Sequence, residues 1–229
     1  MEVVDGRLCE RTEYATGVSS QRTKVKRHPE RGDYDRSTID AILDEALICH
    51  VGFVEEDQPY VIPTIHARDR DTLYLHGSPA SRMLRNLANG IDLCVTVTLL
   101  DGLVLARSVY NHSMNYRSVV VLGHAREVTE TEEKLRAMER VVEHILPGRW
   151  EDARQPSDGE IKGTTILALS LEEASAKIRT GPPKDFDDDL ALPVWAGLIP
   201  LRLEPSPPIP DDGVEASAPD YATDYSRGA

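Results

Sequence analysis

Residues 48–77 read ICHVGFVEEDQPYVIPTIHARDRDTLYLHG, and they indicate the fold class more clearly than any other stretch. A β-rich segment, 48–54, is followed by the turn sequence EEDQP, and two further strand patterns cover 60–67 and 72–77. Only the charged turn RDRD separates the second pattern from the third. Short strands joined by local turns favour antiparallel neighbours, so this stretch predicts a three-stranded meander.

Helical patterns lie on both sides of the meander. Before it, apolar residues recur at helical spacing after Ser37, which can cap the helix. After it, residues 78–90 predict a second helix between Ser78 as N-cap and Gly90 as C-cap.

Further strand patterns and one long helix complete the core. Asp101-Gly102 predicts a hairpin turn, and the long helix over 129–148 opens with Thr129 to Glu132, which resembles a capping box. The additional strands are expected over 93–100, 103–110, 118–128, 164–171 and 175–181. These elements predict a mainly β, α+β fold: an antiparallel barrel of about six to seven strands with peripheral helices.

Two polar tails bracket this core. Residues 1–35 show almost no apolar periodicity and are expected to be partly disordered. Residues 205–229 are rich in Pro and Asp, a composition that cannot bury enough apolar surface to offset its ordering entropy. The sequence therefore predicts one folded domain over 36–204 and a disordered C-terminal tail.

Composition and charge exclude several function classes. The 229 residues carry a formal net charge of -13, which disfavours binding to nucleic acid and to anionic membranes. Three cysteines, Cys9, Cys49 and Cys94, make no disulfide framework. The sequence shows neither a signal peptide nor an apolar run long enough to span a bilayer. We therefore expect a cytoplasmic protein.

Common catalytic and metal-site signatures are absent from the sequence. It contains no GxGxxG, GxxxxGK[ST], HExxH or GxSxG motif, and its seven histidines show no metal-ligand spacing. No dedicated metal site is expected. Cys49 and His50 are adjacent in a strand and point to opposite faces, so they are not expected to form a catalytic pair.

The segment LYLHGSPASRML, residues 73–84, is the strongest candidate for a site. A strand ends, Gly77 lets the chain turn, and a helix begins. Free backbone N–H groups there favour an anion, Ser81 adds a hydroxyl donor, and Arg82 adds a planar fork suited to phosphate. From the residues alone, an ordinary helix cap with a surface arginine explains the segment equally well.

The same segment resembles the flavin-phosphate segment of the pyridoxamine 5'-phosphate oxidase-like FMN-binding split-barrel superfamily. The phrases CVTVTLLDGLVLARS, HSMNYRSVVVLG, EASAKIRTG and PVWAGLIPL are similar to its nitroimidazole-resistance (Nim) and flavin-nucleotide-binding branch. This resemblance covers about 30–205 and implies a split barrel that forms a homodimer with FMN at the dimer interface.

The resemblance also implies which residues contact the cofactor. Ser81 and Arg82 match the phosphate site, while Met83 stands where the family often has Lys. Ile62 and Thr64 are the expected backbone donors to the flavin ring, because Pro63 has no N–H. The full implied set is Val61, Ile62, Pro63, Thr64, Leu75, His76, Gly77, Ser78, Ser81, Arg82, Met83, Arg117, Ser118 and Trp195.

His76 ends a predicted strand and is the candidate catalytic residue. It is expected to contact the flavin, to donate a proton to a substrate, or to serve as the axial ligand of a haem; a hydrogen-bonded histidine at a strand end is the structural alternative. The resemblance implies an FMN-dependent oxidoreductase acting on a small organic molecule. The alternatives are a haem-binding protein on the same barrel and a flavin-binding module without catalysis.

Overall fold

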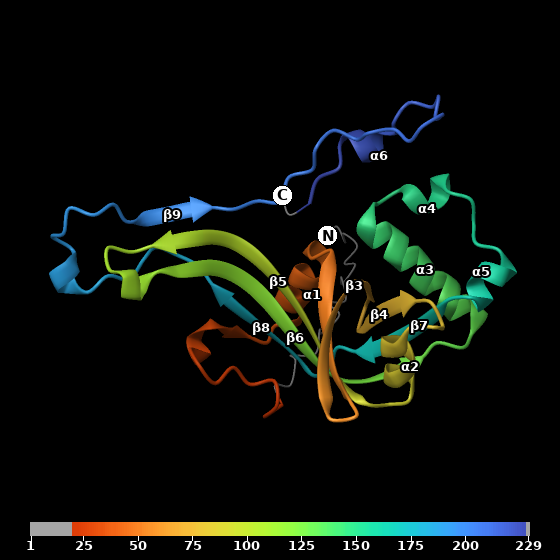
Figure 1. Ribbon diagram of the computed structural model, residues 1–229, viewed down its shortest axis with the longest axis horizontal. Coiled ribbons are helices and arrows are strands. Elements are labelled where there is room, and N and C mark those ends of the chain that lie inside the picture. Colours follow the sequence, from red (N-terminus) through yellow and green to blue (C-terminus); the bar gives the residue numbers. More distant parts are fainter. Residues whose placement is uncertain (1–19, 228–229) are drawn as a thin grey trace, which may run out of the picture.

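A computed structural model describes residues 20–227 of the chain. Residues 1–19 and 228–229, among them Cys9 and much of the predicted N-terminal tail, lie outside the described part. Nine strands form one antiparallel sheet in the order β1-β8-β6-β7-β4-β3-β2-β5-β9, with an additional pairing between β6 and β5 (Figure 1). The predicted class, an antiparallel β fold with peripheral helices, is confirmed.

The strands differ widely in length. They are β1 (Gly32–Asp33), β2 (Ile48–Glu55), β3 (Gln58–Asp69), β4 (Thr72–Gly77), β5 (Asp92–Leu105), β6 (Ser113–Glu127), β7 (Thr165–Ser170), β8 (Ala174–Arg179) and β9 (Gly197–Pro200). The helices are α1 (Arg36–Glu45), α2 (Arg82–Ala88), α3 (Thr131–Ile145), α4 (Arg149–Asp152), α5 (Asp158–Lys162) and α6 (Asp220–Thr223). Three 3-10 turns, η1 (Pro29–Arg31), η2 (Val109–Asn111) and η3 (Asp187–Asp189), lie between them.

Six of the strands close into a barrel. Pairing runs from β6 through β7, β4, β3, β2 and β5 and back to β6. The far halves of β5 and β6 continue beyond the barrel with β8 and β9 and form an arm, which projects to the left in Figure 1. The helices α3, α4 and α5 lie at the opposite end of the molecule (Figure 1).

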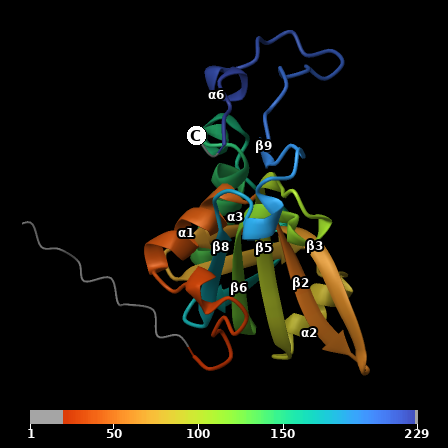
Figure 2. The ribbon, with the colours of Figure 1, turned by 90° about the vertical axis from the view of Figure 1, so that its left-hand side faces the viewer.

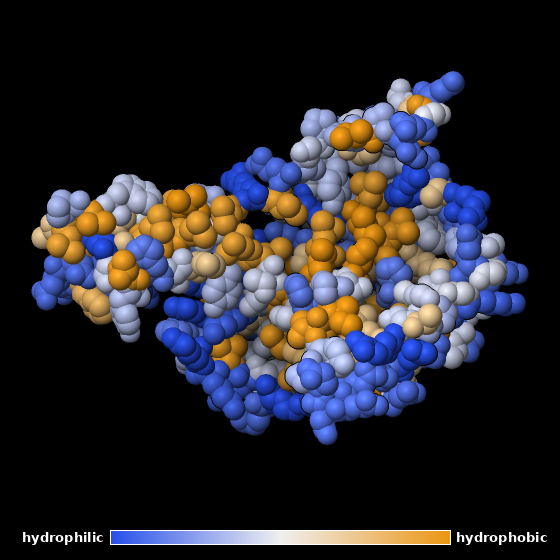
Figure 3. Space-filling model, viewed as in Figure 1, coloured by the Kyte–Doolittle hydropathy of each residue, from blue (hydrophilic) through white to orange (hydrophobic). Residues whose placement is uncertain are grey.

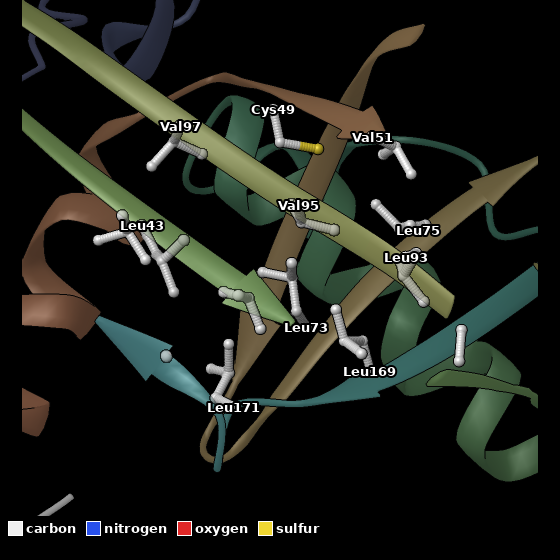
Figure 4. Close-up of a cluster of buried hydrophobic side chains, with 14 of the residues drawn as sticks. Leu43, Cys49, Val51, Leu73, Leu75, Leu93, Val95, Val97, Leu169 and Leu171 are labelled. Atoms are coloured by element: carbon white, nitrogen blue, oxygen red, sulfur yellow. The ribbon is translucent and has the colours of Figure 1, made fainter. Parts of the chain in front are cut away.

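Aliphatic side chains fill the barrel. Alternate residues of β2, β4, β5 and β7 point inward, and Val51, Leu75 and Val95 are fully buried among them (Figure 4). Cys49 belongs to the same cluster, and burial raises the pKa of its thiol to about 12. The outer face of β4 and β7 packs against α3 through a second cluster that includes Tyr74 and Ala137.

The expected hairpin turn at Asp101-Gly102 is wrong. β5 runs through both residues, and its register against β6 is irregular between Leu100 and Gly102. A side chain at Gly102 would lie 3.0 Å from the carbonyl oxygen of Ile199 on β9, so glycine is required here for close strand packing. The chain reverses direction only at η2, Val109–Asn111, between the end of β5 and the start of β6.

Several predicted helix ends are also wrong. Asp35, rather than Ser37, caps α1, because its carboxylate accepts the backbone N–H of Ser37 at 3.0 Å. Ser81, rather than Ser78, caps α2, and Asn89 is the C-cap residue that precedes Gly90. The helix predicted over 129–148 spans 131–145, with Glu130 at its N-cap position and no side-chain cap, so the expected box from Thr129 to Glu132 does not form.

Candidate functional site

The barrel is split between β3 and β4. These strands pair from Asp69 and Thr72 up to His66 and Leu75, and their register pairing ends there. Beyond that point β4 continues to Gly77 paired only with β7, while β3 from Gln58 to Ile65 pairs only with β2. In the described chain, the facing edges of both strands therefore present backbone groups without a ladder partner, and such groups can hydrogen-bond a ligand.

The predicted ring-binding residues lie on one of these open edges. Val61 is 67 % exposed, and Ile62 packs its side chain partly against the core. Thr64 pairs with Cys49 on β2 and is half-buried. Pro63, which has no N–H, lies between Ile62 and Thr64, and these two residues are in register with Val51 and Cys49 of β2.

The loop from β4 to α2 lies on the other side of the split. Its two serines are engaged by the chain itself: the Ser78 hydroxyl accepts the N–H of Ala80 at 3.2 Å, and Ser81 accepts the N–H of Leu84 at 3.4 Å. A side chain at Gly77 would lie 3.1 Å from Leu84, so the absent side chain lets the loop turn tightly onto α2. The loop is thus ordered by its own hydroxyl groups.

Arg82 reaches across the split to the β2–β3 hairpin. Its Nε lies 3.3 Å from a carboxylate oxygen of Glu55, and its guanidinium lies 4.2 Å from the ring centroid of Tyr60. Tyr60 in turn stacks on Phe53 at 5.5 Å between ring centroids. Half of the Arg82 side chain stays exposed, so the cation is positioned at the mouth of the split and remains accessible.

Two other predicted contact residues point into the barrel instead. Leu75 is fully buried and Met83 is 5 % exposed, and both belong to the main hydrophobic cluster. Their side chains are therefore part of the core, and only the Leu75 backbone is near the split. Apolar residues beside a glycine turn serve packing as readily as binding, so the sequence pattern could not separate the two.

His76 faces away from the barrel core. It lies on the same side of β4 as Tyr74, toward α3, and lines a pocket of about 310 Å³. The remaining lining residues come from α3, α4, α5 and the segments next to them: Met138, Val141, Val142, Trp150, Ala153, Arg154, Pro156, Glu160 and Thr164. The pocket wall is mainly apolar, with Arg154 and Glu160 paired at 2.7 Å.

The His76 ring is available to a ligand. Its Nδ1 is buried, and neither ring nitrogen makes a hydrogen bond to a residue between 20 and 227. Burial lowers the pKa of His76, which keeps the imidazole neutral at physiological pH. A neutral imidazole in an apolar pocket is suited to ligate a haem iron.

His66 offers an informative contrast. Its Nδ1 is also buried without a partner in the described chain, but the residue is fully buried. Its Nε2 donates to the carbonyl oxygen of Leu43 at 3.0 Å, and its ring lies 4.9 Å from that of His144. Burial is the main reason that the pKa of His66 falls to about 4. His66 thus serves packing, whereas His76 has a pocket beside it.

The remaining predicted contacts lie on the arm and are separate from the split. Arg117 on β6 pairs with Glu45 of α1 and, at 2.8 Å, with Asp101 of β5. Ser118 donates its hydroxyl to the carbonyl oxygen of Lys177 at 3.1 Å. Trp195 precedes β9 and is 65 % exposed. One copy of the chain does not bring these three residues to the split.

Residues 20–227 offer neither a grouped metal site nor a membrane-spanning helix. Within that range, no three His, Cys, Asp or Glu side chains are grouped as ligands of a metal ion. No helix there is long and apolar enough to cross a membrane. The sequence reasoning missed Trp150 and Arg154, because they lie in short helices and loops that carry no periodicity; a Trp just after a Pro-Gly helix stop was the available signal.

Comparison with known proteins gives consistent matches. A family model for pyridoxamine 5'-phosphate oxidase matches residues 35–178. The flavocytochrome Anf3 from Azotobacter vinelandii is 42% identical, with a TM-score of 0.86, and the match covers 91% of this chain and 98% of that one. An FAD- and haem-binding protein from Mycobacterium smegmatis is 30% identical, with a TM-score of 0.83, covering 86% and 98%.

A more distant match concerns antibiotic resistance. A structure from Bacteroides thetaiotaomicron, described as a 5-nitroimidazole antibiotic resistance protein, is 26% identical with a TM-score of 0.53, covering 64% of this chain and 86% of that one. None of the curated proteins compared matches the chain. The predicted family resemblance, including its nitroimidazole-resistance branch, is therefore confirmed.

Proposed function

Because this chain belongs to the pyridoxamine 5'-phosphate oxidase family, we propose that it is an oxidoreductase that binds a flavin nucleotide at the split and a haem against His76. The observation that carries the proposal is the free ring of His76 on the apolar pocket beneath α3. From the sequence, flavin and haem were alternative expectations. The likeness to a flavocytochrome and to an FAD- and haem-binding protein supports both cofactors in one chain.

The pocket residues fit a haem chemically. His76 would supply the axial nitrogen, Met138, Val142 and Trp150 would contact the apolar porphyrin, and Arg154 offers a cation to a propionate. The same lining excludes water from one side of the ring. Polarity, burial and the axial ligand are the features through which a protein tunes a haem.

The split fits a flavin nucleotide. Ile62 and Thr64 would donate backbone N–H groups to the ring edge, while Arg82 would meet the phosphate end. Flavin supplies hydride or single-electron transfer and haem supplies single-electron transfer, so the two groups together suit electron passage between a donor and a small organic acceptor. The sequence resemblance favours FMN as the flavin nucleotide, whereas the mycobacterial relative is described as binding FAD.

A second copy of the chain would complete the site. The arm exposes several large apolar and aromatic side chains: Val109, Tyr110, Met114, Phe186, Val194, Trp195, Leu198 and Ile199. Figure 3 shows hydrophobic surface, in orange, along the arm at the left. Such a surface marks a protein interface, and the open edge of β3 also needs a cover. In a homodimer, Arg117, Ser118 and Trp195 of one arm would approach the split of the other copy.

The test is His76→Ala compared with His124→Ala. His124 is exposed and pairs with Asp92 at 3.2 Å, away from the pocket, which makes it a matched control. Purified His76→Ala should lose the haem Soret band and keep its flavin, while His124→Ala keeps both. If His76→Ala retains haem but loses turnover, His76 is a proton donor and the haem assignment is wrong.

Turnover separates the oxidoreductase from a flavin-binding module without catalysis. The purified protein should oxidise NAD(P)H or accept electrons from dithionite and pass them to a nitroaromatic or quinone acceptor. Bound flavin that reduces but never turns over would support the module.

A further inference from the structure

The C-terminal ends of α1 and α3 lie side by side and share one cation. Helix ends leave backbone carbonyl groups without intrahelical partners and carry partial negative charge. The Arg227 guanidinium donates from Nη2 to the carbonyl oxygen of Asp44 and from Nε to that of Glu45, each at 2.9 Å. It also donates to the carbonyl oxygens of His144 and, at 3.4 Å, Ile145. One side chain thus caps two helices.

Tyr221, six residues before Arg227, contacts α4. The Tyr221 hydroxyl donates to the carboxylate of Asp152 and accepts from Arg149 Nη1 at 2.9 Å. Its ring covers the turn between α3 and α4, where a side chain at Gly148 would lie 3.5 Å from the ring. Gly148 has φ +87°, a backbone conformation that favours glycine, while the 3.5 Å spacing is an ordinary van der Waals contact.

The segment between the barrel and these contacts makes little contact of its own. Residues 201–219 contain neither helix nor strand and are almost entirely exposed. Figures 1 and 2 both place α6 and the chain end beside α3 and α4. We call residues 219–227 the C-terminal strap, since only this end of the tail is fastened to the body.

The strap grips the outer side of the His76 pocket wall. Trp150, which lines the pocket, lies between Arg149 and Asp152, the two residues that Tyr221 holds. From the inner side α4 is held by Glu143 of α3, whose carboxylate accepts the backbone N–H of Trp150 at 2.8 Å. Gln155 donates from Nε2 to the carbonyl oxygen of Trp150 at 2.9 Å, and the strap adds the contacts of Tyr221 to this four-residue helix.

We propose that the C-terminal strap clamps α3 and α4 in place and so controls how readily the pocket beside His76 releases its ligand. The clamp is the chain's own C-terminal segment. It binds to the C-terminal ends of α1 and α3 and to the turn between α3 and α4. The release part rests on the proposed haem binding; the clamp itself does not. Composition predicts disorder for 205–229, which suits a segment that undocks without unfolding the barrel.

The test uses full-length protein with an N-terminal tag, in the variants Arg227→Ala and Tyr221→Phe. Arg202→Ala is the matched control, because Arg202 is exposed and lies in the unfastened segment. A second form ends at residue 218 and removes the strap without touching the barrel. The first readout is amide hydrogen exchange of residues 143–153 in protein stripped of cofactors.

Exchange in 143–153 should rise about tenfold in Arg227→Ala and in the shortened form, the change expected when charge-assisted hydrogen bonds are lost. Arg202→Ala should match the wild type. Exchange that stays at the wild-type rate in both Arg227→Ala and the shortened form would overturn the clamp.

The second readout is the rate of haem transfer to excess apomyoglobin, which should rise by a similar factor in the strap variants. Faster exchange with an unchanged transfer rate would overturn control of release. If the wild type itself never takes up haem, the proposed function fails, and the exchange result still decides the clamp.

Discussion

His66 on β3 and Leu75 on β4 form the last register pair between their strands, and the barrel opens immediately beyond them. Both side chains are fully buried, Leu75 within the barrel and His66 beneath α1 and α3. The split therefore begins at a firmly packed point, and the open edges that follow are displayed by a rigid support.

Leu75→Ala should cost stability even though the sequence pattern places Leu75 among the cofactor contacts. Its side chain lies inside the barrel, so truncation leaves a cavity and should lower the free energy of unfolding by about 2–5 kcal/mol. Urea denaturation measures this. Val54→Ala, at a position 56 % exposed, is the control and should change little. Equal effects would show that Leu75 is not packed as described.

Arg82→Ala should weaken flavin binding with little effect on folding. Half of its side chain is exposed, so its pair with Glu55 contributes little to stability, whereas a phosphate contact is worth about 1.5–3 kcal/mol, or roughly ten- to a hundredfold in affinity. Flavin fluorescence titration of the stripped protein gives the dissociation constant. Arg85→Ala, exposed on the same helix, is the matched control. Identical constants for the two variants would remove Arg82 from the site.

Acidification should destabilise the fold through His66. Its pKa is near 6.5 when unfolded and about 4 when folded, so the unfolded chain binds the extra proton between these values. The stabilisation is complete above pH 6.5 and is lost as the pH falls toward 4, amounting to about 3 kcal/mol at roughly 1.4 kcal/mol per pKa unit.

Urea midpoints at several pH values measure this slope. His66→Gln removes the titration while keeping a donor for the Leu43 carbonyl group, so its slope should be shallower. A variant that titrates like the wild type would assign the pH dependence to other groups.

Arg117→Ala should loosen the junction of α1 with the arm. The guanidinium joins Glu45 to Asp101, and all three side chains are about two-thirds or more buried. Removing it leaves two carboxylates facing each other, with an expected loss of about 1–3 kcal/mol in unfolding free energy.

Arg126→Ala is the comparison for Arg117. Arg126 forms an ion pair with Glu133 but is 60 % exposed, so its loss should cost less than about 1 kcal/mol. A smaller effect for Arg117 than for Arg126 would contradict a supporting role for the three-residue network.

The sequence predicted the barrel well because period-two alternation is a local signal. The strand at 72–77 matches β4 residue for residue, and 48–54 matches β2 to within one residue. Where glycine serves strand packing rather than a turn, as at Gly102, the local signal is misleading, since the deciding contact with Ile199 is almost a hundred residues away. β1 and β9 were missed because they are too short to alternate.

The candidate site was predictable only in part. Arg82 and Ile62 follow from the family motif and lie on opposite sides of the split. The pocket beside His76 depends on Trp150 and Arg154, which tertiary packing alone brings to β4. The contacts of Arg82 with Glu55 and Tyr60, and those of Arg227 with the ends of α1 and α3, are likewise set by three-dimensional packing rather than by spacing in the sequence.

The absorbance spectrum of freshly purified full-length protein, with the released cofactors identified by mass, is the first measurement of whether one chain binds both a flavin and a haem. We expect flavin bands together with a haem Soret band, and one flavin nucleotide and one haem released per chain. A protein with flavin alone would contradict the haem site at His76. A colourless protein that takes up neither flavin nor haem on incubation would contradict the proposed function as a whole.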